Sequence, residues 1–284
     1  MKAQNYRDAL AMAQGLGLER LDAQLLLLHA LGKPDSERAW LLAHDTEPLT
    51  QPVAQLFRQL SQRRAAGEPL AYIVGNKAFF GLQLRVDARV LVPRPDTETL
   101  VEWALELLQH PGLPPEPALL DLGTGSGAIA LAIAHNLRAS GRTARVLAVD
   151  ASAQALEVAA ENASRLGLAL RLRQGNWLAD LDEGFDLIVS NPPYIASADP
   201  HLAALAHEPL AALAAGPDGL SDLRQITGQA PAHLQPGGWL LLEHGYDQAE
   251  AVRQLLRDQG FLQVQSRRDL AGIERCSGGQ WPGG

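Results

Sequence analysis

Residues 121–127 read Asp-Leu-Gly-Thr-Gly-Ser-Gly and follow directly from an apolar run that begins at Ala118. Glycines at this point let the backbone pass close beneath a ligand, and the N-terminus of a helix from about Ala128 offers unpaired N–H groups. Beyond this loop, apolar runs alternate with helical stretches. Such alternation is typical of an α/β protein whose mostly parallel sheet is covered on both faces. We predict this fold for residues 93–284.

Six apolar runs are the predicted strands of the sheet. They lie at 118–122, 145–149, 168–172, 185–189, 239–242 and 261–264. Helical stretches separate them, and the one from Ser152 to Leu166 is stopped by Gly167, which is suited to a helix C-terminus.

The first part of the chain has a different pattern. Leu21, Leu25 and Leu28 recur at helical spacing, which predicts a small helical bundle over residues 1–70. Between 71 and 92 the period changes to the alternation of a strand, and we predict a β-hairpin that connects the two domains.

The composition excludes several classes of protein. The formal net charge of −8 argues against a surface built to neutralise nucleic-acid phosphates. A single cysteine, Cys276, rules out a disulfide framework and a cysteine-rich metal centre, and we predict no metal site. The sequence shows neither a charged leader with an apolar core nor an apolar stretch long enough to span a membrane. We therefore expect a soluble cytoplasmic protein.

The glycine-rich loop is compatible with two kinds of ligand. A dinucleotide is one, but its fingerprint is G-x-G-x-x-G, and the third glycine comes one residue early here. A carboxylate at Asp121 would also repel a pyrophosphate and attract an ammonium group. S-adenosylmethionine carries an ammonium group and no phosphate, so the loop fits this cofactor better. The predicted cofactor contacts of the loop are Asp121, Gly123, Thr124, Gly125, Ser126 and Gly127.

Further candidate contacts follow the next two predicted strands. Asp150 comes roughly 20 residues after the loop, where a carboxylate can accept both ribose hydroxyls; its alternative role is to cap the helix from Ser152. Asn176 and Trp177 follow the third strand and are placed to contact adenine, although Trp177 could equally be a core residue. Because ligands of open α/β sheets bind at the carboxyl ends of the strands, these positions together predict one site.

Residues 191–194 read Asn-Pro-Pro-Tyr and follow the apolar run at 185–189. Two prolines remove two backbone donors, which leaves nearby carbonyls free to accept hydrogen bonds. Asn191 adds a side-chain acceptor, and Tyr194 adds an aromatic face for a flat group. We predict that Asn191, Pro192, Pro193 and Tyr194 hold an amino or amide nitrogen against an electrophile, with Asn191 also touching the cofactor. The alternative is a proline-rich turn.

Two of these segments belong to a larger set. The set comprises Leu-Val-Pro-Arg-Pro-Asp-Thr-Glu at 91–98, the loop at 121–127, Asn-Pro-Pro-Tyr at 191–194, Glu-Pro at 208–209 and Leu-Glu-His-Gly at 242–245. In this combination the chain resembles the release-factor glutamine methyltransferases over nearly its whole length. The resemblance implies a Rossmann-like S-adenosylmethionine-dependent methyltransferase with a seven-stranded sheet, whose last strand, from about Glu274, is antiparallel.

The resemblance also implies an activity. Members of the family transfer a methyl group from S-adenosylmethionine to the glutamine side chain in the Gly-Gly-Gln motif of class 1 peptide release factors, which modulates translation termination. Residues 1–70 would then dock the protein substrate, 71–92 would be a linker and 93–284 the catalytic domain, with no nucleic acid or membrane as partner. Asn176 and His207 depart from residues common in relatives.

Two other functions remain open from the residues alone. The Asn-Pro-Pro-Tyr segment is shared with methyltransferases that act on amino groups of DNA or RNA bases, although the acidic charge and the lack of a long basic segment argue against them. A non-catalytic module that keeps the fold is the second alternative. Residues 278–280 read Gly-Gly-Gln, a copy of the substrate motif that we expect to lie at the end of the last strand.

Overall fold

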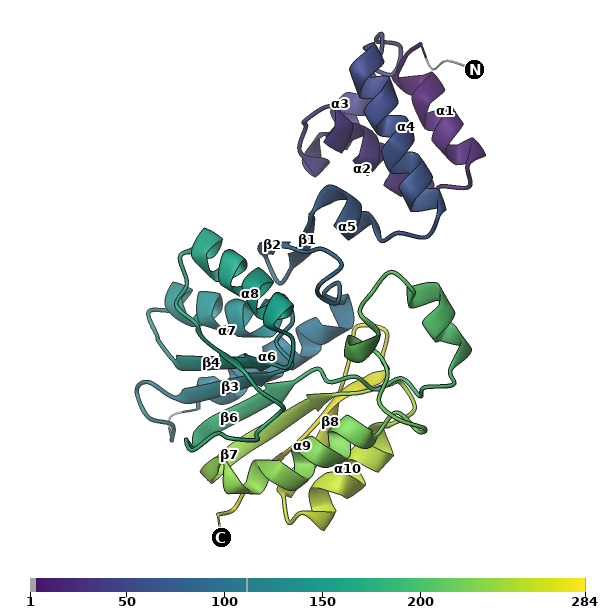
Figure 1. The fold of residues 1–284 in the computed structure, drawn as a ribbon. Coiled ribbons are helices and arrows are strands. Elements are labelled where there is room, and N and C mark those ends of the chain that lie inside the picture. Colours follow the sequence, from purple (N-terminus) through teal and green to yellow (C-terminus); the bar gives the residue numbers. More distant parts are fainter. Residues whose placement is uncertain (1–3, 111, 284) are drawn as a thin grey trace. The chain divides into compact units, whose positions relative to one another are not determined.

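The computed structural model describes residues 4–110 and 112–283, which form two compact units (Figure 1). The first unit ends at Asn76 and the second begins at Lys77. No helix within the described residues is both long enough and apolar enough to cross a membrane.

The first unit is a helical bundle. Its elements are α1 (Tyr6–Gly15), α2 (Arg20–Ala30), η1 (Asp35–Glu37), α3 (Arg38–Ala43), α4 (Gln51–Ala65) and α5 (Leu70–Val74). The buried stripe of α2 differs from the predicted one, because Leu21 is 46% exposed whereas Leu26, Leu27 and Leu28 are fully buried. Four consecutive leucines make several stripes equivalent in sequence, and packing against Phe57 of α4 selects the one that is buried.

The predicted hairpin begins later than its pattern indicates. Residues 70–74 form α5, which ends at Gly75 in the left-handed conformation (φ +73°). The hairpin itself consists of β1 (Asn76–Phe79) and β2 (Leu82–Arg85). Its apolar side chains lie in the core of the second unit together with those of two sheet-covering helices. The hairpin is therefore packed into that unit, and the three-part functional division of the chain stays a prediction.

The second unit is built on a seven-stranded sheet of order β5-β4-β3-β6-β7-β9-β8. The strands are β3 (Ala118–Leu122), β4 (Arg145–Asp150), β5 (Arg171–Gln174), β6 (Phe185–Ser190), β7 (Leu234–Glu243), β8 (Leu262–Arg268) and β9 (Glu274–Gln280). The pairs from β5 to β7 are parallel, and β9 is antiparallel to both its neighbours. The predicted α/β fold, including the antiparallel last strand from Glu274, is confirmed.

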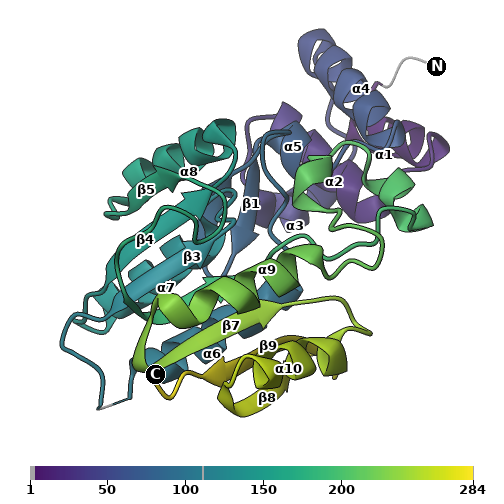
Figure 2. The same cartoon turned by 60° about the horizontal axis from the view of Figure 1, so that its bottom comes forward.

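Helices cover both faces of this sheet (Figures 1 and 2). One face carries α6 (Glu98–Leu108), α7 (Ala128–Ala139) and α8 (Ala153–Leu166), and the other carries α9 (Ser221–Gln229) and α10 (Ala249–Asp258). In β3, Leu119 belongs to the core beneath α6 and α7, whereas Leu120 belongs to the core beneath α9 and α10. Successive strand side chains point to opposite faces, so an uninterrupted apolar strand fills both cores.

Short 3-10 helices complete the second unit. They are η2 (Pro95–Thr97), η3 (Pro200–Leu205), η4 (Leu210–Ala212) and η5 (Ala230–Ala232). The segment that contains η3 and η4 joins β6 to α9, directly after the Asn-Pro-Pro-Tyr tetrapeptide.

Two strands begin well away from their predicted starts, and β8 extends to Arg268, beyond its predicted end. Although residues 168–172 are mostly apolar, β5 starts only at Arg171, because the parallel ladder with β4 begins with the pair Leu147–Arg171. Conversely, β7 starts at Leu234 and runs through Pro236, with an irregular register against β6. A Pro-Gly-Gly sequence reads as a turn, but a β-bulge accommodates such residues within a strand.

Asn162 of α8 ties the hairpin to the glycine-rich loop. Its Oδ1 accepts a hydrogen bond from the backbone N–H of Arg85 at 2.7 Å, and its Nδ2 donates to the carbonyls of Arg85 (3.0 Å) and Ser126 (2.9 Å). The side chain is fully buried. The three backbone groups that it satisfies would otherwise be without partners in the interior.

Asn162→Ala should therefore lower the free energy of unfolding by roughly 3 kcal/mol, since buried polar groups without partners are costly. Urea unfolding followed by circular dichroism measures the change. Asn136→Ala is the matched control, because Asn136 makes one hydrogen bond to a carbonyl of its own helix and its loss should cost less than about 1 kcal/mol. Equal losses in the two variants would contradict the tie.

Candidate active site

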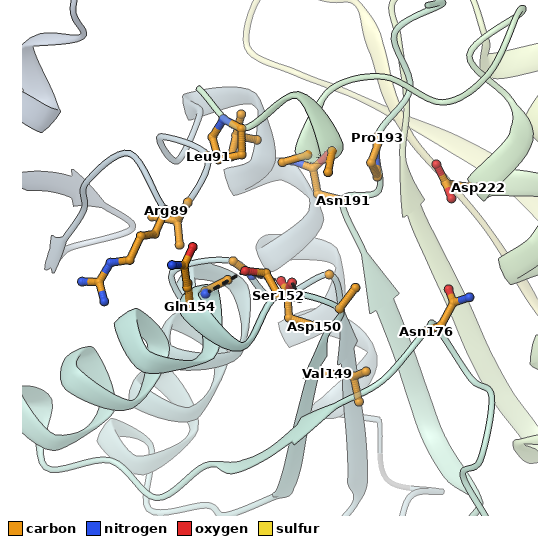
Figure 3. A pocket seen from close by; sticks show the side chains of 18 of the residues that line it. Arg89, Leu91, Val149, Asp150, Ser152, Gln154, Asn176, Asn191, Pro193 and Asp222 are labelled. Carbon is orange, nitrogen blue, oxygen red and sulfur yellow. Dashed lines mark hydrogen bonds between the residues drawn. The ribbon is translucent and has the colours of Figure 1, made fainter. Parts of the chain in front are cut away.

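A cavity of about 380 Å³ opens at the carboxyl ends of β3, β4, β5 and β6 (Figure 3). The order of the strands reverses at this point, because β4 lies on one side of β3 and β6 lies on its other side. Open α/β sheets bind their ligands at such a point. The cavity brings together these predicted residues: Gly123, Gly125, Asp150, Asn176, Trp177, Asn191 and Pro193.

The glycine-rich loop forms the floor of the cavity. Gly123 (φ +68°) and Gly125 (φ +55°) both adopt the left-handed conformation, which favours glycine. A Cβ atom on Gly123 would come within 3.2 Å of Cζ3 of Trp177, whereas one on Gly125 would meet no atom within 4 Å. The first glycine thus permits close packing of the tryptophan, and the second leaves room for a ligand over the backbone.

Asp150 ends β4 at the cavity wall. Its Oδ2 accepts a hydrogen bond from the N–H of Gly125 at 2.8 Å, and its Oδ1 accepts one from the N–H of Ser152 at 2.9 Å. Burial raises the pKa of Asp150 above its ordinary value, while these hydrogen bonds oppose the shift. The N-cap of α8 is Ser152, whose side chain accepts a hydrogen bond from Ala155. Asp150 thus fixes the loop and has lone pairs left for a ligand.

Asp121 lies behind the loop and not at the cavity surface. The side chain is fully buried, and its Oδ2 accepts hydrogen bonds from Oγ1 of Thr124 (2.7 Å) and the N–H of Ala130 (3.2 Å). Its Oδ1 has no partner among the described residues. Burial raises the pKa of Asp121 to about 7, and the neighbouring charge of Asp150 adds to the shift. Thr124, Ser126 and Gly127 are likewise absent from the cavity lining.

Trp177 is held by a residue that sequence reasoning did not find. Its Nε1–H donates to Oδ1 of Asp222 at 3.1 Å, and both side chains line the cavity. Burial raises the pKa of Asp222. Asp222 stands in the first turn of α9, and no motif marks it in the sequence. The indole also packs against the core beneath α9 and α10, so the two roles considered for Trp177 coexist.

The chemistry of the lining suits S-adenosylmethionine. Two carboxylates, Asp150 and Asp222, line the cavity. The cation in the lining, Arg89, is hydrogen-bonded to Asp87 and Glu157 and points away from Asp150 (Figure 3). Acceptors suit ribose hydroxyls and a cationic ligand, and the Oδ1 of Asp121 is a buried acceptor without a partner. Among the described residues of the lining, a pyrophosphate would meet no unpaired cation, which argues against a dinucleotide.

A second cavity, of about 70 Å³, shares part of its wall with the first. Its lining consists of Leu91, Arg94, Asn191, Tyr194, Ile195, Leu205, Ala212 and Leu213. Asn191 is the polar side chain that lines both cavities. Any group bound in the small cavity therefore lies next to the large one across a wall made by Leu91, Asn191 and Ala212.

The Asn-Pro-Pro-Tyr tetrapeptide is held on both sides. The Nδ2 of Asn191 donates to Oγ1 of Thr97 at 3.2 Å, so Oδ1 remains available as an acceptor. The carbonyl of Tyr194 accepts a hydrogen bond from Nε2 of Gln248 at 3.0 Å. In the part of the chain that the structure describes, the carbonyl of Pro192 accepts no hydrogen bond. The arrangement presents two acceptors on a fixed frame.

Two buried glutamates lie around the small cavity. Glu208 accepts hydrogen bonds from the N–H of Val92 (3.0 Å) and from the guanidinium of Arg94. Glu243, at the end of β7, is 1% exposed, and its Oε1 lies 3.5 Å from Oη of Tyr194. Both belong to segments that carry the family resemblance, but their partners are more than 45 residues away in sequence, so no local pattern indicates these contacts.

The Gly-Gly-Gln copy at 278–280 lies within the sheet, at the end of β9. Gln280 pairs with Trp239 in the middle of β7, which pairs in turn with Leu187 of β6, whereas Asn191 follows the carboxyl end of β6. The side chain of Gln280 donates to the carbonyl of Gly237. The copy is thus part of β9, as predicted, and lies outside the site of its own chain.

Comparisons with known proteins agree with this geometry. Residues 4–75 match the family described as PrmC N-terminal domain, and residues 115–274 match a methyltransferase domain. A release factor glutamine methyltransferase of Bordetella pertussis is 52% identical over 93% of this chain and 95% of that protein. Another, from Xylella fastidiosa strain Temecula1, is 50% identical over 97% of this chain and 98% of its own length.

The chain belongs to the release factor glutamine methyltransferase family. S-adenosylmethionine is accordingly its cofactor. Solved structures show the same fold. A methyltransferase from Pyrococcus furiosus has a TM-score of 0.54 at 21% identity and covers 80% of this chain and 98% of its own. The catalytic domain of hMettl16, solved with an RNA hairpin, has a TM-score of 0.56 at 16% identity over 83% of this chain and 85% of its own.

Because the pKa of Asp121 is raised, the free energy of unfolding of this member of the release factor glutamine methyltransferase family should depend on pH. Because the folded-state pKa (about 7) exceeds the ordinary value of 3.8, the folded chain binds more protons between these values. The free energy of unfolding should then fall as pH rises from about 4 to 7, by up to about 1.4 kcal/mol per pH unit for this group. In Asp121→Asn this contribution should vanish.

Urea unfolding of the ligand-free protein at a series of pH values measures this effect. The wild-type free energy of unfolding minus that of Asp121→Asn should decline up to pH 7 and level off above it. Asp258→Asn, at an exposed carboxyl group, serves as the control. A difference that stays constant with pH would contradict the raised pKa of Asp121.

Proposed function

We propose that this chain transfers the methyl group of S-adenosylmethionine to the side-chain amide of the glutamine in the Gly-Gly-Gln motif of class 1 peptide release factors, and so modulates translation termination. One observation carries the proposal above the others: Asn191 lies in the wall of both cavities. A transferase needs its donor and acceptor sites to meet, and these two cavities meet at an amide-binding side chain.

The large cavity is the proposed cofactor site. Asp150 would accept the ribose hydroxyls, and Asn176 with Trp177 would contact the adenine. The loop glycines would let the ligand lie close to the backbone, while the free acceptor of Asp121 supplies negative potential beneath the amino-acid end. When bound, the cofactor supplies a methyl group attached to a cationic sulfur.

The small cavity is the proposed site of the glutamine amide. The Oδ1 of Asn191 and the carbonyl of Pro192 would each accept one amide hydrogen, while Pro193 holds the frame rigid and Tyr194 packs on the amide plane. Because both acceptors lie on the amide hydrogens, they favour positive charge on the nitrogen.

Orientation accounts for much of the chemistry in this proposal. An amide nitrogen is a weak nucleophile because its lone pair is delocalised into its own carbonyl. Holding both hydrogens fixes the direction of that lone pair. This placement removes the entropy cost that an encounter in solution would carry. After the nitrogen–carbon bond forms, the nitrogen loses one hydrogen as a proton to water, and Asn191 need only accept hydrogen bonds.

The substrate class follows from three observations. Relatives at about half identity over nearly the whole chain are named for release factors, and the net charge of −8 disfavours nucleic acid. The small volume of the second cavity, about 70 Å³, suits a side-chain amide better than a purine base. The proposal implies a cytoplasmic location and no membrane partner. Residues 1–70 would dock the folded release factor.

Transfer of labelled methyl groups tests the proposal. Purified protein should methylate a bacterial class 1 release factor, while duplex DNA and ribosomal RNA remain unlabelled under the same conditions. If residues 1–70 dock the factor, a short Gly-Gly-Gln peptide should be methylated with a much lower kcat/KM than the intact protein. Labelling of nucleic acid with no labelling of the release factor would overturn the proposal.

Asn191→Ala should lower kcat more than a hundredfold, because an acceptor used in the transition state contributes on the order of 3 kcal/mol. Affinity for S-adenosylmethionine, measured by calorimetry, should stay within about tenfold, since the other predicted cofactor contacts remain. Near-normal turnover of the purified variant would refute the role of Asn191.

Asp150→Ala should weaken binding of S-adenosylmethionine by roughly 2–4 kcal/mol, since hydrogen bonds to a charged carboxylate are among the strong ones. Asp186→Ala is the matched control. Asp186 also accepts a backbone hydrogen bond, but from Ala118 at the amino end of β3. Calorimetry should show a normal dissociation constant for the control. An unchanged constant for Asp150→Ala would restrict Asp150 to holding the loop.

A further inference from the structure

Glu243 is a buried carboxyl group beneath the acceptor tetrapeptide. Its side chain sits at the end of β7, next to β6, which delivers Asn191. Tyr194 donates its hydroxyl hydrogen to Oε1 at 3.5 Å, and the nearby Thr97 side chain favours the charged form of the carboxyl group and lowers its pKa. The other oxygen, Oε2, has no partner among the described residues. A buried carboxyl group is costly, and Glu243 forms no ion pair with any residue of the described ranges 4–110 and 112–283.

Thr97 connects Glu243 to Asn191. It occupies the N-cap position of α6, but its hydroxyl makes no capping hydrogen bond. Threonine at this position normally accepts a hydrogen bond from the backbone of its own helix. Instead, Oγ1 accepts the hydrogen bond of Asn191 Nδ2 at 3.2 Å. Thr97 as a whole residue is only 4% exposed, so water does not compete for its hydroxyl.

The direction of these hydrogen bonds follows from the carboxylate. A threonine hydroxyl has one hydrogen to donate, and an ionised carboxylate can only accept. Facing Glu243, the hydroxyl therefore donates to it and must accept from Asn191. The only group of Asn191 that can donate is Nδ2, so Oδ1 is left on the side of the cavities.

We infer that Glu243 is a positioning residue, which acts through the Thr97 hydroxyl to keep the Asn191 carboxamide oriented with Oδ1 toward the methyl acceptor. The inference rests on the function proposed above. A hydrogen-bond donor at position 243 would no longer fix the direction of these hydrogen bonds. Thr97 could then donate to Oδ1 of Asn191, which turns Nδ2 toward the substrate. Two N–H groups would then face each other across the small cavity, and the glutamine amide would lose an acceptor.

The titratable groups around Glu243 come from three segments, which are η2, β9 and the loop after β6. Asp96 of η2 raises its pKa and Arg275 of β9 lowers it, and these two side chains also pair with each other at 3.2 Å. Tyr194 donates from the loop after β6, and Cys276 pairs with Glu243 between β9 and β7. Burial is the largest influence and raises the pKa of Glu243 to about 7. The carboxylate that directs the chain should therefore be lost as pH falls through 7.

The test uses the full-length protein at saturating S-adenosylmethionine, with an intact release factor as substrate. Glu243→Gln keeps the size of the side chain but adds a donor, and Thr97→Val keeps the shape but removes the hydroxyl. Each should lower kcat by about 10- to 100-fold, the range expected for a misplaced acceptor, with the cofactor dissociation constant unchanged. Thr97→Ser, which restores the hydroxyl, should recover most of the rate.

Two further readouts separate positioning from a structural role. The wild-type kcat should fall below about pH 7, and this dependence should be absent in Glu243→Gln. The double variant should be no slower than the slower single variant, because both changes interrupt one chain and their effects do not add. Thr227→Val is the matched control, since this buried hydroxyl of α9 bonds only to carbonyls of its own helix; its kcat should equal that of the wild type.

The inference is overturned if Glu243→Gln or Thr97→Val retains the wild-type rate and pH profile, if Thr97→Ser is as slow as Thr97→Val, or if the double variant shows the product of the single losses. Should Glu243→Gln fail to fold, the Thr97 pair and the wild-type pH profile decide the matter alone. A wild-type chain that methylates no release factor would instead refute the proposed function, so the two failures are distinguishable.

Discussion

The hydrogen bond from Asn191 Nδ2 to Thr97 Oγ1, 3.2 Å long, is the constraint on which the rest of the site depends. Asparagine presents a donor and an acceptor of nearly equal size, so its carboxamide can face a cavity with either. Occupying the nitrogen on the protein side leaves the oxygen where the two cavities meet. An amide substrate offers hydrogens, and only the oxygen can receive them. In the proposed function, this one fixed torsion decides whether the site can hold its nucleophile.

The sheet supplies the rigidity that this constraint needs. Asn191 follows β6, which lies between β3 and β7 in parallel register, and Glu243 ends β7 beside it. Hydrogen bonds to neighbouring strands on both sides fix these strand ends, so side chains placed there keep a defined orientation. The price of the arrangement is burial of carboxyl groups: Asp121 and Glu243 are both almost inaccessible to water, and burial raises the pKa of each to about 7. Stability is thereby reduced at the pH where the site is charged.

The sequence predicted the parts of the site that depend on local chemistry. The glycine loop, Asp150 and Asn191 were placed at strand ends because their side chains and backbone properties have few other uses there, and the cavity does bring them together. Partners distant in sequence were not predictable. Thr97 lies 94 residues before Asn191, and a threonine at the start of a helix is more typical of a cap. Asp121 is a further case. It follows the expected strand end, but its carboxyl group lies behind the loop and not at the cavity surface. Repeated leucines in α2 left the buried face undetermined for a related reason, because only tertiary packing distinguishes equivalent stripes.

Neutron diffraction from a deuterium-exchanged crystal of the protein tests the central claim most directly, since deuterium positions reveal both the carboxamide orientation and the hydroxyl direction. At a pH above 8, where Glu243 is ionised, deuterium should lie on Asn191 Nδ2 toward Thr97, and the Thr97 deuteron should point at Glu243. A Thr97 deuteron that points at Oδ1 of Asn191, with Nδ2 facing the cavities, would contradict the account.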